Sequence, residues 1–163
     1  MFVADLGSDL VRVLQHGGAG LAALPPLRTA PGAGPRHVAI HPALSKVYVV
    51  NELNSTIEVF AYDIHKSEGQ REQTVSTLPP SCEQPSFCAA IRISSSGSHV
   101  YVSNRGHDSI AIFSVDASSG LLTWIACEST QGKYPRDIQI VGDWMIAANQ
   151  VSGQCKSCMN FVS

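Results

Sequence analysis

Short runs in which apolar and polar residues alternate with a period of two recur along this chain. They occupy residues 36–41, 90–94 and 136–140. Each run passes through a polar turn into a second, more apolar run, at residues 47–50, 99–102 and 144–147. A period of two bounded by glycine, proline, serine and aspartate is typical of β-hairpins. We therefore expect an all-β chain of consecutive antiparallel strands.

These hairpins belong to a longer repeat. In each unit an aspartate or asparagine, which we call the anchor, ends an apolar strand and precedes a polar turn and a further strand. The anchors are Asp5, Asn51, Asn104 and Asn149, separated by 46, 53 and 45 positions. Four antiparallel strands in roughly 45–53 residues are the pattern of a β-propeller blade. The 163 residues therefore predict a partial β-propeller, with about three four-stranded blades and an incomplete one.

The repeat also predicts which residues are equivalent in successive blades. The residues that follow the anchors form one set, namely Leu6, Glu52, Arg105 and Gln150. The first strands give a second set, namely Arg36, Ala89 and Arg136. Structural positions repeat in kind, as Tyr48 and Tyr101 do, whereas the polar members of these sets differ between blades. Such variation is what a site with non-repeating chemistry requires, and freely varying loop residues are the alternative interpretation.

Composition and charge argue against several classes of protein. Charged residues make up 15% of the chain and the formal net charge is −2, which argues against nucleic-acid or membrane-surface binding driven by bulk basicity. No apolar run reaches the roughly 18 residues of a transmembrane helix. The first five residues reach an acid without a basic segment, so we expect no signal peptide.

The cysteines point to a reducing compartment. Five are present at irregular spacings, which indicates free thiols and a cytoplasmic protein. Cys155 and Cys158 form a CxxC pair, but no second pair of ligands follows it, so we expect neither a zinc site nor any other metal site. We interpret the pair as incidental.

Several motifs together resemble one family. They are GPRHVAIHP at residues 34–42, VVNEL at 49–53, DLG at 5–7, SNRGHDSI at 103–110 and GKYPRD at 132–137. In this order and spacing they resemble the seven-bladed lactonase propellers, which include bacterial-type 6-phosphogluconolactonases and fungal carboxy-cis,cis-muconate cyclases. The resemblance covers residues 1–150 as an incomplete propeller, whereas residues 151–163 depart from the pattern as a divergent tail. Family members are about twice this length, which suggests a truncated gene model or an alternative transcript end.

The resemblance implies a site in the central channel with Arg36, Glu52 and Arg105 as catalytic residues. In the muconate cyclases the matching positions belong to the proposed active site together with a histidine from an earlier strand, which would lie upstream of Asp5. We assign substrate binding to three further residues, namely His37, Arg136 and Gln150. A packed, hydrogen-bonded residue beside a turn is the alternative interpretation for His37, and a surface ion pair is the alternative for Arg136. No cofactor is implied.

The chemistry of these residue types suits an anionic lactone. An arginine guanidinium binds phosphate or carboxylate through two parallel hydrogen bonds. A second arginine could stabilise the oxyanion that forms when the lactone carbonyl is attacked. Glu52 could activate water as a general base, or move a proton during ring closure.

Other polar and aromatic residues have simpler explanations. His41 is expected to be a hydrogen-bonded residue beside a turn, and His107-Asp108 is expected to cap a turn because Ser8-Asp9 and Asn54-Ser55 replace it in other units. Trp124 and Trp144 lie in strand patterns and are expected to pack between blades.

Three functions remain open. The first is a lactone hydrolase of the 6-phosphogluconolactonase type in the pentose phosphate pathway, expected to be inactive as this fragment. The second is a lactonising enzyme of the muconate cyclase type, and the third is a non-catalytic propeller fragment that acts as a binding module. The expected partner is an anionic small-molecule lactone, with no nucleic acid and no membrane. Open blade edges are expected to allow self-association.

Overall fold

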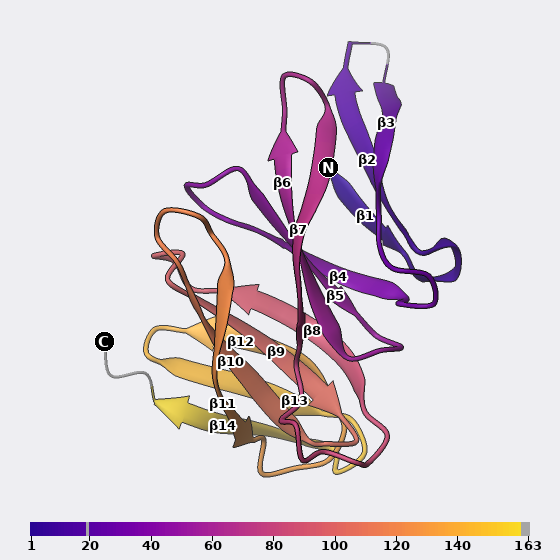
Figure 1. Ribbon diagram of the computed structural model, residues 1–163. Helices are drawn as coiled ribbons and strands as arrows, with labels where there is room; N and C mark the ends of the chain where they lie inside the picture. The colour runs from indigo at the N-terminus through magenta and orange to yellow at the C-terminus, as the bar shows by residue number, and fades with distance from the viewer. Residues whose placement is uncertain (19, 161–163) are drawn as a thin grey trace.

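The chain folds into four antiparallel sheets that follow one another in sequence order (Figure 1). This computed structural model describes residues 1–18 and 20–160, with the backbone alone for 158–160. The first sheet contains β1 (Phe2–Asp5), β2 (Leu10–Gly17) and β3 (Gly20–Arg28), with the short 3-10 helix η1 (Leu6–Ser8) between β1 and β2. The second contains β4 (Pro35–Ile40), β5 (Lys46–Asn51), β6 (Thr56–Asp63) and β7 (Glu68–Ser76).

The third sheet contains β8 (Phe87–Ile93), β9 (His99–Arg105), β10 (Ser109–Val115) and β11 (Leu122–Ser129). The fourth contains β12 (Pro135–Val141), β13 (Trp144–Asn149) and β14 (Gln154–Asn160). Within each sheet every strand pairs with its sequence neighbour. The predicted partial propeller is confirmed, and among the described residues its two four-stranded sheets stand between two three-stranded ones.

The first strands of successive sheets lie side by side. β4 contacts β8, and β8 contacts β12, so the first strands of the second, third and fourth sheets form a row, and we call them the inner strands. The second strands of the two middle sheets, β5 and β9, are buried on both faces; in β5, Val47, Tyr48, Val49 and Val50 are all buried. A continuous apolar run of this length is typical of a strand covered on both sides.

Three apolar clusters fill the spaces between sheets. The middle cluster joins the second and third sheets and includes Tyr48, Ile91 and Phe113. The Tyr48 hydroxyl donates a hydrogen bond to the Gly120 carbonyl at 2.9 Å, so even this polar atom links two sheets. Trp124 packs against the same cluster, as predicted, and its ring is perpendicular to that of Phe113 with 5.4 Å between the ring centres.

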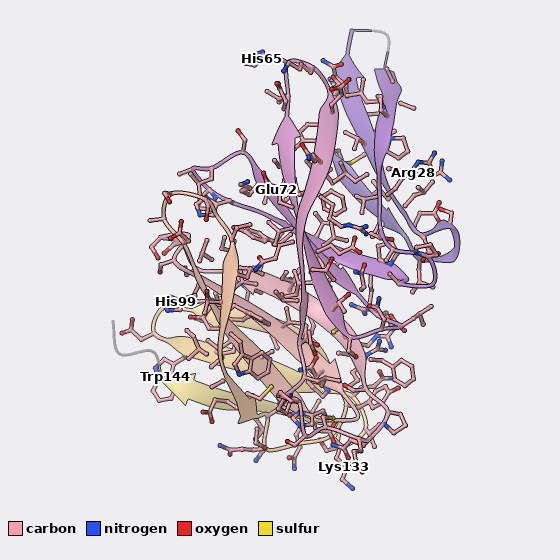
Figure 2. All side chains as sticks on the ribbon, viewed as in Figure 1. Arg28, His65, Glu72, His99, Lys133 and Trp144 are labelled. Carbon is pink, nitrogen blue, oxygen red and sulfur yellow. The ribbon has the colours of Figure 1, made fainter. Side chains whose placement is uncertain are left out.

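Trp144 does not follow the prediction. Its side chain is 49% exposed, and Figure 2 shows it at the surface of the last sheet. Met145, the next residue of β13, is buried against the third sheet. Alternation along the strand therefore turns Trp144 to the opposite face, where no described sheet covers it. Exposed apolar side chains also occur on the first sheet, at Val3 and Leu21; self-association through such surfaces stays a prediction.

In the first three sheets, a threonine that follows the last strand is hydrogen-bonded to an earlier turn of the same sheet. The backbone N–H and the hydroxyl of Thr29 both donate to the Asp9 carbonyl. Thr77 makes the same pair of bonds to Ser55, and Thr130 makes them to Asp108. The three acceptor residues have φ values of 53°, 52° and 57°. These links lie at equivalent positions, directly after the last strands β3, β7 and β11. From there the chain continues to the first strand of the next sheet.

The asparagine anchors are buried. Asn51, Asn104 and Asn149 are 0%, 0% and 2% exposed. The Asn104 amide N–H donates to the Thr77 carbonyl at 2.8 Å, and Asn104 Oδ1 lies 2.8 Å from the Thr77 hydroxyl, whose single proton is shared between this oxygen and the Ser55 carbonyl. Asp5 differs, since it is partly exposed and pairs with Arg12. The anchors therefore fix the ends of β5, β9 and β13, directly before Glu52, at Arg105 and before Gln150.

Burial makes the stability of this fold sensitive to alkaline pH. Burial raises the pKa of Cys88 to about 12 and that of Tyr48 to about 12. Above about pH 9 the unfolded thiol loses its proton while the folded thiol keeps it, so the free energy of unfolding is expected to fall toward pH 12, by up to about 1.4 kcal/mol per pH unit for each group. Below pH 9 the contribution is fully present.

Denaturant unfolding between pH 7.5 and 10.5 measures this effect. Cys88→Ala is the matched control, because it removes the thiol and leaves Tyr48, whose phenol starts to contribute only above about pH 10. The variant is expected to flatten the fall between pH 9 and 10. A wild-type free energy that stays constant up to pH 10.5 would contradict the buried, protonated thiol.

Candidate active site

A β-bulge marks the same position in three inner strands. The pairing register shifts between Pro35 and His37, between Cys88 and Ile91, and between Pro135 and Asp137. The skipped residues include Arg36, Ala89 and Arg136, so their predicted equivalence is confirmed. A bulge leaves a residue out of the ladder and redirects its side chain. Arg36 and Arg136 are thereby turned toward the same end of the inner strands.

The residues after the anchors reach that same end. The Glu52 N–H donates to the Gly34 carbonyl at 2.7 Å, and the Gln150 N–H donates to the Tyr134 carbonyl at 3.0 Å. Each bond joins the end of a second strand to the start of its inner strand. Glu52 and Gln150 therefore lie beside the bulged arginines of their own sheets, and their predicted equivalence is confirmed.

Glu52 stands between two arginines from different sheets. Its Oε2 lies 3.2 Å from Arg36 Nε, and its Oε1 lies 3.0 Å from Arg105 Nη2. The side chains of Arg36 and Glu52 are each 22% exposed, whereas that of Arg105 is 6% exposed. The three residues predicted to be catalytic are therefore in direct contact.

Arg105 is held by protein groups on several sides. Its Nε donates to the Phe87 carbonyl at 3.2 Å, and its Nη2 donates to the Cys88 carbonyl at 2.9 Å. The guanidinium carbon also lies 5.4 Å from the ring centre of Tyr134, within the range of a cation–π contact. The geometry orients Arg105 toward Glu52 and leaves it few donors for a ligand.

Arg36 and Arg136 border a hollow, which we call the arginine hollow. It encloses about 540 Å³ and is lined by Arg36, His37, Arg136 and Asp137. Arg136 Nη1 donates to Gln150 Oε1 at 3.1 Å, and within the described residues Arg136 makes no ion pair. Burial, and then the charge of Arg105, lower the pKa of Arg36. Positive charge at this hollow is thus only partly balanced by the protein.

His37 faces the same hollow as a neutral imidazole. Burial lowers its pKa below the usual value, and the nearby Arg92 guanidinium acts in the same direction. Arg92 Nη1 lies 3.3 Å from His37 Nε2, and its Nη2 pairs with Asp137 Oδ1 at 2.9 Å. Arg92 therefore connects all three inner strands.

The sequence did not single out Arg92 or Tyr134. By register with the second strands, Arg92 on β8 is equivalent to Ala39 on β4 and Gln139 on β12. A charged residue at a position that is uncharged in the other two sheets could have marked Arg92 as a candidate site residue. Tyr134 could have been found by aligning GKYPRD with the GPR motif, because the tyrosine stands where that motif has Gly34.

His41 and the His107-Asp108 pair have the structural roles that the sequence predicted. His41 Nδ1 accepts the N–H groups of Ala43 and Leu44 at 3.0 and 2.8 Å, which closes the turn after β4. Asp108 Oδ1 accepts the N–H groups of Gly106 and Tyr134, and His107 contacts the Ser109 hydroxyl. The predictions that His41 is hydrogen-bonded beside a turn and that His107-Asp108 caps a turn are confirmed.

Among residues 1–18 and 20–157, no group of three or more histidine, cysteine or acidic side chains is arranged to hold a metal ion. Cys155 is a free, exposed thiol on β14, while the side chain of Cys158 lies outside the described residues, so the interpretation of the CxxC pair stays a prediction. Within the described part of the chain, no helix is long and apolar enough to cross a membrane.

Comparison with known proteins gives a consistent match. The family model described as "Lactonase, 7-bladed beta-propeller" matches residues 1–158. A protein of Lactococcus lactis subsp. cremoris is 43% identical over 155 residues, covering 93% of this chain and 46% of its own length. A Bacillus subtilis protein named 6-phosphogluconolactonase is 40% identical over 126 residues, covering 76% of this chain and 36% of its own length.

Comparison with solved structures agrees with the family match. A Lactobacillus plantarum protein aligns with a TM-score of 0.86 at 33% identity, over 98% of this chain and 51% of that one. The periplasmic gluconolactonase of Pseudomonas aeruginosa aligns with a TM-score of 0.86 at 28% identity, over 98% of this chain and 49% of that one. The chain thus spans about half the length of these structures, and less than half that of the two curated relatives.

Proposed function

The chain belongs to the lactonase family of seven-bladed β-propellers, and from this membership we propose that its arginine hollow binds and opens a sugar lactone that carries a phosphate. The fold and the relatives support a lactone hydrolase. The expectation that this fragment is inactive stays a prediction, and lactone turnover by the chain would contradict it. Two findings favour the phosphorylated substrate: a relative is named 6-phosphogluconolactonase, and the hollow carries excess positive charge.

The charge of the site is the observation that carries this proposal. Four of the seven arginines in the chain either line the hollow or belong to the ion-pair groups that include its lining residues, although the chain has a net charge of −2. They are Arg36, Arg92, Arg105 and Arg136. Two carboxylates, Glu52 and Asp137, form ion pairs within this group. The surplus is about two positive charges, which matches the charge of a phosphate monoester near neutral pH.

The proposed reaction is hydrolysis at the lactone carbonyl. Glu52 accepts a proton from a water molecule, whose oxygen bonds to the carbonyl carbon. Each oxygen of Glu52 has an arginine partner and keeps a second lone pair for that proton. Arg36 donates to the oxyanion that forms. The bond between the carbonyl carbon and the ring oxygen then breaks, and the ring oxygen takes the proton from Glu52.

The other residues have supporting roles in this proposal. Arg105 holds the Glu52 carboxylate in place through its Nη2. Arg136 binds the phosphate and is oriented by Gln150. Neutral His37 offers a hydrogen bond to a sugar hydroxyl. We further propose a cytoplasmic location, which the free thiols of Cys82, Cys88, Cys127 and Cys155 support.

Replacing Arg136 by glutamine tests the substrate assignment. We expect the KM for a 6-phosphorylated gluconolactone to rise roughly 10- to 100-fold, since hydrogen bonds to charged groups contribute about 1.5–3 kcal/mol. The KM for unphosphorylated gluconolactone should change little. Lys133→Gln is the matched control, because it removes a neighbouring positive charge outside the residues that line the hollow.

Two outcomes would overturn the assignment. One is equal turnover of both lactones by the wild-type chain with no effect of Arg136→Gln. The other is turnover of a tricarboxylic muconolactone in preference to both sugar lactones, which would favour the lactonising function instead.

A further inference from the structure

Tyr134 adopts a backbone conformation that a bulky residue rarely takes. Its φ is +64°, close to the +66° of Gly34. Both residues stand directly before a proline and a bulged arginine, in KYPR and AGPR. For a residue with a Cβ this left-handed region is strained, and such strain gathers where function maintains it. Glycine is therefore the expected residue at position 134, and the tyrosine calls for an explanation.

The turn itself imposes the conformation. The N–H of Tyr134 donates to Asp108 Oδ1 at 2.8 Å, as the N–H of Gly34 donates to Asp9 Oδ1 at 2.9 Å. Their carbonyls accept the N–H groups of Gln150 and Glu52. Because the backbone bonds are the same in both sheets, they do not explain the side chain of Tyr134.

The two positions differ in what the side chain would meet. A Cβ on Gly34 would lie 2.6 Å from Leu53 Cγ and 3.3 Å from Leu6 Cγ, so that space is filled. Leu6 follows the anchor of the preceding sheet, and the corresponding neighbour of Tyr134 is Arg105. There the tyrosine ring covers the guanidinium, 5.4 Å from ring centre to Cζ.

We propose that Tyr134 is a positioning residue that fixes the plane of the Arg105 guanidinium against Glu52. Carbonyls of Phe87 and Cys88 hold the edge of this guanidinium, and the ring covers it from the direction of the next sheet. Water is thereby kept from Arg105, and its Nη2 stays on Glu52 Oε1 at 3.0 Å. The catalytic consequence rests on the proposed function, whereas the restraint on Arg105 does not.

The test compares Tyr134→Gly and Tyr134→Phe with the wild-type chain. Glycine accepts the backbone conformation and removes the ring, while phenylalanine keeps the ring and removes only the hydroxyl. Gln131→Gly is the matched control, because Gln131 is also at positive φ, +53°, in the same connection but has no contact with Arg105. The first readout is hydrogen exchange of the Arg105 Nε–H, measured by NMR; the second is kcat and KM for the phosphorylated lactone.

The Tyr134→Gly variant is expected to exchange the Arg105 Nε–H roughly 3- to 30-fold faster, the range that the loss of a cation–π contact gives. Its kcat should fall by a similar factor with KM nearly unchanged. Tyr134→Phe and Gln131→Gly should both behave like the wild type.

Unchanged exchange in Tyr134→Gly would overturn the proposal, as would faster exchange of the same size in Gln131→Gly. A wild-type chain without lactone turnover would count against the proposed function alone, because the exchange measurement still decides whether Tyr134 restrains Arg105.

Discussion

Replacement of Glu52 by glutamine is expected to lower kcat for lactone hydrolysis by roughly 100- to 10,000-fold, the usual contribution of a general base. Glutamine has nearly the same shape but cannot accept the proton of the attacking water. The same change removes the negative charge between Arg36 and Arg105. Binding of inorganic phosphate should therefore tighten while turnover falls, and steady-state kinetics with phosphate titration measure both.

Asp137→Asn is the matched control for this experiment. Asp137 is the other paired carboxylate of the group and also lines the arginine hollow, but it is 63% exposed and has no catalytic role in the proposed reaction. Its replacement should change kcat far less. An unchanged kcat in Glu52→Gln, in a variant that melts like the wild type, would remove Glu52 from the mechanism.

Asn104→Leu is expected to cost about 2–4 kcal/mol in the free energy of unfolding. Asn104 is fully buried, and its amide satisfies both the carbonyl and the hydroxyl of Thr77. Leucine has a similar volume but leaves the carbonyl without its principal donor inside the protein, where an unmet polar group costs about 1–3 kcal/mol in addition to the lost hydrogen bonds. Urea unfolding measures the difference.

Asn51→Leu provides the comparison at an equivalent anchor. Its amide donates to the Thr56 hydroxyl, but its Oδ1 has no partner among the described residues. Leucine there removes an oxygen that is already unsatisfied, so the cost should be clearly smaller. Equal costs at both positions would show that burial alone, rather than the link to Thr77, accounts for the anchors.

The repeat in the sequence was sufficient to predict the sheets and the equivalent positions within them. Period-two alternation and the four anchors are local patterns, and they identified the equivalent positions that include Arg36 and Glu52, whereas the family resemblance placed these two residues in one site. The contact of Glu52 with Arg105 needed the family resemblance, since it joins two sheets. The roles of these residues remain proposals.

Contacts between residues that are far apart in the sequence explain what the sequence did not reveal. The links from Thr29, Thr77 and Thr130 join residues about 20 positions apart and leave no local pattern. Arg92 reaches His37 and Asp137 across about 45–55 positions. The prediction that Trp144 packs between blades was wrong. Alternation shows that successive side chains lie on opposite faces of the strand, but only a neighbouring sheet determines which face is covered.

The central claim is that the arginine hollow is the binding site for an anionic sugar lactone. Titration of the isotope-labelled chain with 6-phosphogluconate, the ring-opened product, tests it most directly by NMR. The account predicts saturable shifts at the side-chain Nε–H groups of Arg36 and Arg136 and at the backbone N–H groups of His37 and Gln150. Absence of saturable shifts, or shifts centred instead on the separate hollow lined by Tyr62, Asp63 and His65, would contradict it.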